Sequence, residues 1–312
     1  MGGFAGRSLA MADVTLLESL KNSYFQEEAC SSDTLSSYRV TRGIWAGTTE
    51  WSNVVIAESP EYGRVLFLDK ELQSAESDER IYHEHLVHPI LNALSHVPNK
   101  RVLIVGGGEG ATAREVLKYS KESVSQVVWI DIDNSLVELC RRHLSWADDD
   151  VYNDPRLMFL SMDIRVFLEG NMTTFDVILL DLPDPDVDAL TNFPNNTTQL
   201  YGEAFWVSLR ANLRPGGAIA THAGPIAPGS DGSKHREGLT WIQTIAEKVL
   251  GSKGMAYHVN IPSFQSEWGF WMSVRPKGEG QFPDHLAVMD LETQTLAFTW
   301  PKYWFSPYIG NH

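Results

Sequence analysis

Short runs of consecutive apolar residues alternate with helix-like segments from residue 98 onward. Such runs predict buried strands, because a strand covered by helices on both faces needs apolar side chains on both. The predicted strands are 102–105, 127–131, 157–160, 176–181 and 218–222. Strands that alternate with helices form a parallel, doubly wound sheet, which segments near 255–261 and 269–274 are expected to close as antiparallel strands. The pattern therefore predicts an α/β fold.

The chain before residue 98 has a different pattern. Residues 1–37 show little periodicity beyond one or two amphipathic turns around Leu17. Short β-rich runs separated by turn formers follow, and Ser77 and Asp78 are suitable N-caps for a helix that reaches about Leu94. We expect four parts: a weakly structured segment (1–37), a small antiparallel β-domain (38–80), a Rossmann-like domain (81–276) and an extension of unknown role (277–312).

A glycine-rich turn follows the first strand of the Rossmann-like domain. Gly106, Gly107, Gly108 and Gly110 separate this strand from a segment of helical composition. Glycines between a strand and a helix N-terminus are how α/β folds bind nucleotides, because they allow a tight turn and close approach of the backbone. Glu109 lies inside the turn and is unusual for a phosphate site. Alone, the turn indicates only a nucleotide-like ligand.

Acidic residues follow the next two strands. Asp131 lies roughly 20 residues beyond the glycine turn, where ribose hydroxyls are held in such folds. Asp133 either supports this contact or caps the helix that begins near Asn134. Asp163 could accept the exocyclic amine of adenine, although it could equally be a helix N-cap.

Two more acids follow the fourth strand. Asp181 lies at the carboxyl end of the strand, which is the ligand side of an open α/β sheet. Prolines on both sides of Asp184 stiffen the chain, so that both acids can face one pocket. Clustered carboxylates repel one another unless a cation lies among them. We therefore expect an acidic ligand edge without a basic partner, which would repel phosphate and favour a sulfonium or a polyamine.

Composition excludes several classes of protein. The 312 residues are 43% hydrophobic and 21% charged, with a formal net charge of -15, so the basic footprint of a nucleic-acid binder is missing. Cys30 and Cys140 are too few for a disulfide framework, which favours a reducing, cytoplasmic location. The chain also lacks an apolar run of about 18 residues, so we expect no membrane span.

Three histidines, His83, His85 and His88, are close together in the predicted helix. Their spacing is not that of the His-Glu-x-x-His zinc motif, and only His85 and His88 share a helical face. We therefore expect no metal site here.

Taken together, these motifs resemble those of the spermidine and spermine synthases, which are aminopropyltransferases. The matching pieces are residues 62–69, Gln73, and residues 78–88, 106–117, 154–156 and 181–185, in the family's order over about residues 45–275. Glu109 with Ala111, the segment 223–225 and the segment 262–270 look closest to the thermospermine synthases of plants and algae. The resemblance implies a methyltransferase-type Rossmann-like sheet that follows a small antiparallel β-domain.

The resemblance also implies substrates and residue roles. The donor would be decarboxylated S-adenosylmethionine, the acceptor a polyamine (spermidine or putrescine), and no further cofactor would be needed. The implied donor-binding residues are Gln73, Gly106, Gly107, Gly108, Glu109, Asp131, Asp163 and Ile164. Tyr82 and His83 would line the acceptor side, Asp184 would anchor an amine, and Asp181 would be the catalytic acid–base residue. A gatekeeping loop after Asp184 and a homodimer or homotetramer are implied as well.

Some positions depart from the family pattern. Ser52 and His222 stand where the family usually has Gln. Beyond about Lys277 nothing matches the family, and residues 298–305 have no role that we can assign. Other functions remain open at this point: an S-adenosylmethionine-dependent methyltransferase, an NAD-dependent dehydrogenase, or a polyamine-binding protein without catalysis. Within the family, spermidine to thermospermine is the preferred reaction and putrescine to spermidine the alternative.

Overall fold

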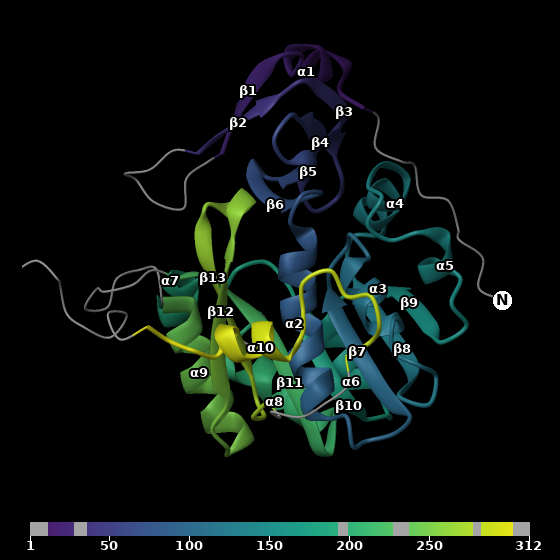
Figure 1. Cartoon of the computed structure of the whole chain (residues 1–312), viewed down its shortest axis with the longest axis vertical. Coiled ribbons are helices and arrows are strands. Elements are labelled where there is room, and N and C mark those ends of the chain that lie inside the picture. Colours follow the sequence, from purple (N-terminus) through teal and green to yellow (C-terminus); the bar gives the residue numbers. More distant parts are fainter. Residues whose placement is uncertain (1–11, 28–35, 193–198, 227–236, 277–281, 302–312) are drawn as a thin grey trace, which may run out of the picture. The chain divides into compact units, whose positions relative to one another are not determined.

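The structure is a computed structural model that describes residues 12–27, 36–192, 199–226, 237–276 and 282–301. The chain forms two compact units (Figure 1). The small unit contains the residues up to Glu79 together with Gly108–Gly110 and Asp133–Asp148. The large unit contains the remaining segments, Arg80–Gly107, Ala111–Ile132 and the chain from Asp149 onward.

The small unit is built on antiparallel strands. A four-stranded sheet has the order β3-β4-β5-β6, and a two-stranded sheet pairs β1 with β2. Its elements are α1 (Val14–Ser19), β1 (Ser23–Gln26), β2 (Ser37–Val40), β3 (Arg42–Thr48), β4 (Asn53–Ser59), β5 (Gly63–Leu68), β6 (Glu71–Ala75) and α4 (Asn134–His143). Phe67 packs its ring against those of Phe25 and Tyr38, at 4.3 and 5.5 Å, which joins the two sheets. The small N-terminal antiparallel sheet of the predicted fold class is confirmed.

The large unit is built on a seven-stranded sheet with the order β12-β13-β11-β10-β7-β8-β9. The strands are β7 (Lys100–Gly106), β8 (Val124–Asp131), β9 (Leu157–Ser161), β10 (Phe175–Asp181), β11 (Leu213–Ile226), β12 (Met255–Ile261) and β13 (Ser266–Met272). Strands β7 to β11 pair in parallel, whereas β12 and β13 are antiparallel. The predicted doubly wound α/β sheet, closed by antiparallel strands, is confirmed.

Strand β11 is longer than its apolar run predicts, since it begins at Leu213 and ends at Ile226. Its end pairs with β13 after a register shift between His222 and Pro225. The register shift therefore lies near the carboxyl end of β11, directly after His222.

Helices cover both faces of this sheet (Figure 1). They are α2 (Glu79–Ala93), α3 (Ala111–Leu117), α5 (Asp149–Tyr152), α6 (Ile164–Gly170), α7 (Val187–Asn192), α8 (Glu203–Ala211), α9 (Glu237–Leu250) and α10 (Leu291–Ala297). On one face, α6, α8 and α9 bury a core of strand residues such as Ile178 and Ile219 together with Trp206 and Ile242. Burial of a side chain of this size stabilises the fold by roughly 1.5–3 kcal/mol.

Helix α2 is tied to several other elements of the large unit. Asn92 donates to Gln294 of α10 at 3.1 Å, and the Tyr257 hydroxyl of β12 donates to the carbonyl of His85 at 2.9 Å. The buried carboxylate of Glu84 accepts the backbone N–H groups of residues 287, 288 and 289 at 2.9, 2.9 and 2.7 Å. Within the described ranges, none of the helices combines the length and apolarity needed to cross a bilayer.

Candidate active site

The centre of the site is the point where the strand order reverses. Strands β7 and β10 are neighbours, and the chain continues from β7 to one side of the sheet and from β10 to the other. Their carboxyl ends are in register, with Gly106 opposite Asp181. Open α/β sheets bind ligands in the crevice at such a switch point.

Two glycines let the turn backbone lie against Asp181. Gly106 has a φ of +81°, and a Cβ added there would lie 2.1 Å from the carbonyl oxygen of Asp181. The N–H of Gly107 donates to this carbonyl at 2.8 Å. A Cβ at Gly107 would lie 2.6 Å from Asp181 Oδ2. Both positions need glycine, because a side chain would displace the acid.

Two hydroxyl groups hold the Asp181 carboxylate. The Tyr82 hydroxyl, from α2, donates to Oδ1 at 2.7 Å, and the Thr112 hydroxyl, from α3, donates to Oδ2 at 2.5 Å. Each carboxylate oxygen can accept more than one hydrogen bond, so Asp181 can still accept from a ligand. Thr112 is a functional residue that the sequence reasoning missed. Its position in the first turn of the helix after the glycines could have indicated that it lies at the site.

Asp184 lies beside His222, which comes from β11. His222 Nδ1 is 3.5 Å from Asp184 Oδ1, and the imidazole stacks on Trp268 with ring centroids 6.1 Å apart. His222 is buried, whereas the Asp184 side chain is 44% exposed. Although part of the side chain is exposed, the surrounding protein desolvates the Asp184 carboxyl and raises its pKa, and the neighbouring His222 lowers it by a smaller amount.

Aromatic rings surround the Tyr82 side chain. Its ring lies 5.7 Å from that of His222 and 5.5 Å from that of Phe270, with His83 at 5.0 Å. Tyr201 is buried as well, and its pKa is raised by burial and, more weakly, by the carboxylates of Asp184 and Asp181. Tyr201 is therefore neutral at any physiological pH. These rings provide apolar walls next to the two acids.

Besides Gly106 and Gly107, the large unit contains three residues that we expect on the donor side, and they lie at or just after the ends of β8 and β9. Asp131 is the last residue of β8 and is 8% exposed. Asp163 is the N-cap of α6 and accepts the backbone N–H of Arg165 at 2.8 Å. Ile164 is the first residue of α6 and is buried.

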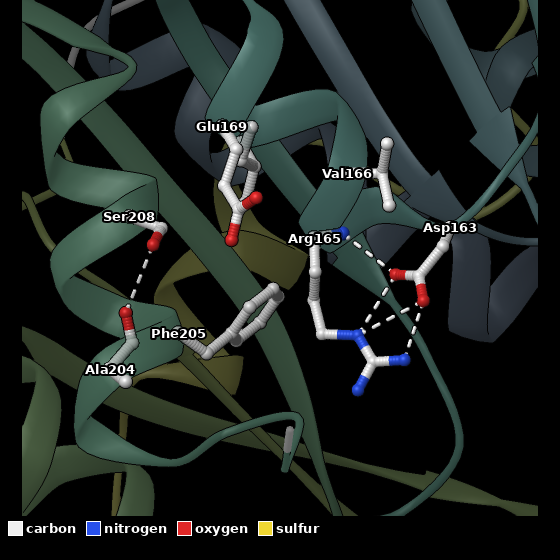
Figure 2. Close-up of a pocket in the computed structure, with 8 residues that line it drawn as sticks. Asp163, Arg165, Val166, Glu169, Ala204, Phe205 and Ser208 are labelled. Atoms are coloured by element: carbon white, nitrogen blue, oxygen red, sulfur yellow. Dashed lines mark hydrogen bonds and ion pairs between the residues drawn. The ribbon is translucent and has the colours of Figure 1, made fainter. Parts of the chain in front are cut away.

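Asp163 has a basic partner, so the expectation of an acidic edge without one is wrong at this position. The Arg165 guanidinium donates to both carboxylate oxygens, at 3.0 and 2.5 Å (Figure 2). This hydrogen-bonded ion pair lowers the pKa of Asp163. The pair lines a surface pocket of about 370 Å³ between α6 and α8, together with Glu169, Phe205 and other residues.

The remaining residues that we expect on the donor side belong to the small unit. Gln73 lies on β6, and Gly108 and Glu109 lie in the turn between β7 and α3. Asp133 also belongs to this unit. It caps α4 by accepting the N–H of Leu136 at 3.0 Å, which confirms the alternative reading of this residue.

The other two histidines of α2 have structural partners. His85 Nδ1 lies 2.6 Å from the carbonyl of Ile81, and burial lowers the pKa of His85 to about 4. His88 Nε2 lies 2.9 Å from the buried carboxylate of Glu115. Cys30 and residues 193–198 of the predicted gatekeeping loop lie outside the described residues.

Family comparisons agree with this arrangement. The model of the spermine/spermidine synthase domain matches residues 79–282, and that of the spermidine synthase tetramerisation domain matches residues 24–76. The chain belongs to the spermine/spermidine synthase family. The resemblance noted in the sequence is confirmed, and the methyltransferase alternative is not favoured.

Individual relatives in this family are aminopropyltransferases. The chain is 41% identical to polyamine aminopropyltransferase 2 of Pseudomonas aeruginosa over 76% of its own length and 63% of that protein. It is 35% identical to the thermospermine synthase ACAULIS5 of Arabidopsis thaliana over 83% of its length and 72% of that protein. The spermidine synthase structure from Thermotoga maritima shares the fold, with a TM-score of 0.72, 21% identity and 95% coverage of both chains.

Proposed function

We propose that this protein is a polyamine aminopropyltransferase. It would move the aminopropyl group of decarboxylated S-adenosylmethionine to an amine of a polyamine and release methylthioadenosine. The observation that carries the proposal is the arrangement of Asp181 at the switch point, held by two hydroxyls, with Asp184 nearby. Family membership and the names of the relatives support the same chemistry.

The reaction is a displacement at the methylene carbon attached to the sulfonium sulfur. The lone pair of the acceptor nitrogen forms the new C–N bond, and the C–S bond electrons go to sulfur. A neutral thioether leaves, so the leaving group needs no metal. The attacking nitrogen must first be unprotonated, and a primary amine resembles Lys with a pKa of about 10.4. Only a small fraction is free at neutral pH, so the enzyme must orient that fraction and accept its proton.

Asp181 is suited to orienting the nitrogen. Its carboxylate is fixed through both oxygens by neutral donors, and these two donors bring no charge of their own. An amine hydrogen can therefore bond to a remaining lone pair and direct the nitrogen lone pair toward the methylene carbon. The proton released as the C–N bond forms passes to Asp181 and then to solvent.

The donor contacts are proposed from the family resemblance. Asp131 would hold the ribose, the turn Gly106–Gly108 would approach the nucleoside, and Gln73 would lie beside the donor. An adenine amine at Asp163 would share a carboxylate that already accepts from Arg165. Glu109 would bind the donor's amine and disfavour ordinary S-adenosylmethionine, whose extra carboxylate it would repel.

For the acceptor, we propose spermidine with thermospermine as product, supported by the Arabidopsis relative and by the matching turn and loop segments. Putrescine to spermidine is the second candidate, because the matching family model includes the spermidine synthases. Decarboxylated S-adenosylmethionine is a co-substrate, and no cofactor is proposed. The match to the tetramerisation domain supports a homo-oligomer.

The test is release of methylthioadenosine from decarboxylated S-adenosylmethionine with putrescine and with spermidine, followed by chromatography that separates thermospermine from spermine. Asp181→Asn should lower kcat/KM by about 100-fold or more, because an amide cannot accept the proton and loses a charge-assisted hydrogen bond. Circular dichroism and thermal unfolding control for folding. A variant that folds and keeps most of the activity would refute the role of Asp181.

A further inference from the structure

The ring orientation of His222 is fixed. Its Nε2 lies within hydrogen-bonding distance of the carbonyl of Leu182. A carbonyl oxygen only accepts, so Nε2 must carry a hydrogen. The stack on Trp268, with the ring planes 16° apart, holds the imidazole in this orientation. The other ring nitrogen, Nδ1, is therefore the one that can change its protonation state.

His222 Nδ1 faces an acid but makes no hydrogen bond to the described residues. It lies 3.5 Å from Asp184 Oδ1, and His222 is only 3% exposed. If both groups were unprotonated, the lone pair of the buried imidazole would face the carboxylate, which is unfavourable. A proton or another cation between them removes this repulsion.

The family resemblance implies an amine anchor at Asp184. We propose that His222 is the second member of this anchor, and that the empty pair holds one proton which the acceptor's non-reacting ammonium displaces. This inference rests on the proposed function. In the empty enzyme, the imidazolium of His222 neutralises Asp184. When the acceptor binds, its N–H groups donate to Asp184 and to Nδ1, and the Nδ1 proton leaves to solvent. One hydrogen-bond donor replaces another, and the net charge of the subsite does not change.

We assign this proton to His222 and Asp184 because of the state of the groups around them. The Tyr82 hydroxyl of α2 donates a hydrogen bond to Asp181, so these two groups are partners of each other and not of the pair. Tyr201 stays neutral because burial raises its pKa far above the physiological range. From β13, the facing side chain is Trp268, which does not titrate. Among the described residues, His83 is a further titratable neighbour of the pair and packs on Tyr82.

The position of Asp184 is suited to exchange of the proton for a ligand. Its side chain is 44% exposed, so an ammonium can reach it, whereas His222 lies behind it. Asp184 Oδ2 would lie 3.0 Å from a Cβ placed on Gly224, so the glycine backbone gives the carboxylate its space. Glutamine, the residue that the family resemblance leads us to expect at position 222, could bond to an ammonium but could not titrate.

The proposal makes acceptor binding depend on pH through His222. As the pH falls, protonated His222 competes with the ammonium, so the acceptor KM should rise. Displacement of one proton limits this rise to about tenfold per pH unit. The amine that attacks also titrates, but it does so identically in every variant. The ratio of the wild-type KM to the variant KM therefore isolates the contribution of His222.

Kinetics of three variants test the role of Nδ1. His222→Phe keeps a ring to stack on Trp268 but has no acceptor, and should raise the acceptor KM about tenfold or more while the donor KM stays within about twofold. His222→Gln should restore acceptor binding relative to His222→Phe and lack the rise in KM at acidic pH. His96→Phe, at an exposed histidine, is the matched control and should behave as wild type.

Calorimetry tests the proton directly. The acceptor that the wild type turns over is titrated into enzyme saturated with methylthioadenosine, at about pH 6 and about pH 8, in two buffers of different ionisation enthalpy. The wild type should release up to one more proton than His222→Gln at the lower pH. The proposal is overturned if the wild type and His222→Gln release equally many protons and the ratio of their acceptor KM values does not change with pH. This test does not depend on whether His222→Phe folds. Absence of methylthioadenosine with every polyamine would instead refute the proposed function, and the subsite with it.

Discussion

Removal of a single hydroxyl, in Tyr82→Phe, isolates the contact that connects helix α2 to the acid of β10. The variant removes the donor to Asp181 Oδ1 at 2.7 Å and leaves Thr112 on the other oxygen. The phenyl ring can keep its contacts with His83 and Phe270, because these involve the ring and not the hydroxyl. Asp181 is then held by Thr112 alone, so it can leave more easily the orientation proposed to direct the attacking nitrogen.

The size of the effect follows from the charge on the acceptor. A hydrogen bond to an ionised group contributes about 1.5–3 kcal/mol. At about 1.4 kcal/mol per factor of ten, loss of this bond should lower kcat/KM by roughly 10- to 100-fold. Most of the loss should appear in kcat, because the orientation of Asp181 matters once both substrates are bound.

The assay is methylthioadenosine release at saturating donor with the acceptor varied. Tyr257→Phe is the matched control, since its buried hydroxyl donates to a backbone carbonyl, that of His85, at 2.9 Å. That control should lower the free energy of unfolding by about 1 kcal/mol and change kcat/KM by less than about twofold. The reasoning fails if Tyr82→Phe folds and keeps kcat/KM within about twofold of wild type, or if Tyr257→Phe loses as much activity.

Two further predictions concern the donor and the pH dependence of stability. Glu109→Gln should bind ordinary S-adenosylmethionine more tightly than wild type does, because repulsion of its carboxylate is removed; equal affinity by calorimetry would contradict the selectivity proposed for Glu109. His85, with its pKa lowered to about 4, stays neutral in the folded chain and gains a proton on unfolding below its ordinary pKa of about 6.5. Its contribution to stability is therefore complete above about pH 6.5 and lost as the pH falls toward about 4, by about 3 kcal/mol in total. Denaturant unfolding at several pH values should show a weaker pH slope over this range in His85→Asn, and an unchanged slope would count against it.

The sheet could be predicted where burial alone decides the pattern. Strands β7, β8 and β10 lie between two layers of helices, so most of their side chains are apolar on both faces, and this is visible in the sequence. The extent of β11 could not be predicted, because its end is determined by pairing with β13 after a register shift at His222. The partner strand is about 40 residues away, beyond the reach of any local pattern.

Some features of the site could also be predicted from the sequence, and others could not. Asp181 could be predicted, because any acid that ends an inner strand lies on the ligand side. Its pairing with Tyr82, 99 positions away in the chain, and with Thr112 depends on how two helices pack on the sheet. Asp163 was assigned to an acidic edge because its charge was visible in the sequence. That Arg165 bonds back to this carboxylate depends on the helix cap geometry.

The backbone N–H groups of residues 287–289 donate to the Glu84 carboxylate, and this has a consequence for folding during synthesis of the chain. Glu84 follows Tyr82 and His83 by only one or two positions on α2, yet its three main-chain donors are synthesised about 200 residues later. Until they emerge from the ribosome, a carboxylate that is buried in the finished protein lacks these partners, and ordering the nearby Tyr82 on the sheet carries that cost. We therefore expect Tyr82 to become fully ordered on the sheet only after residues 287–289 have been synthesised.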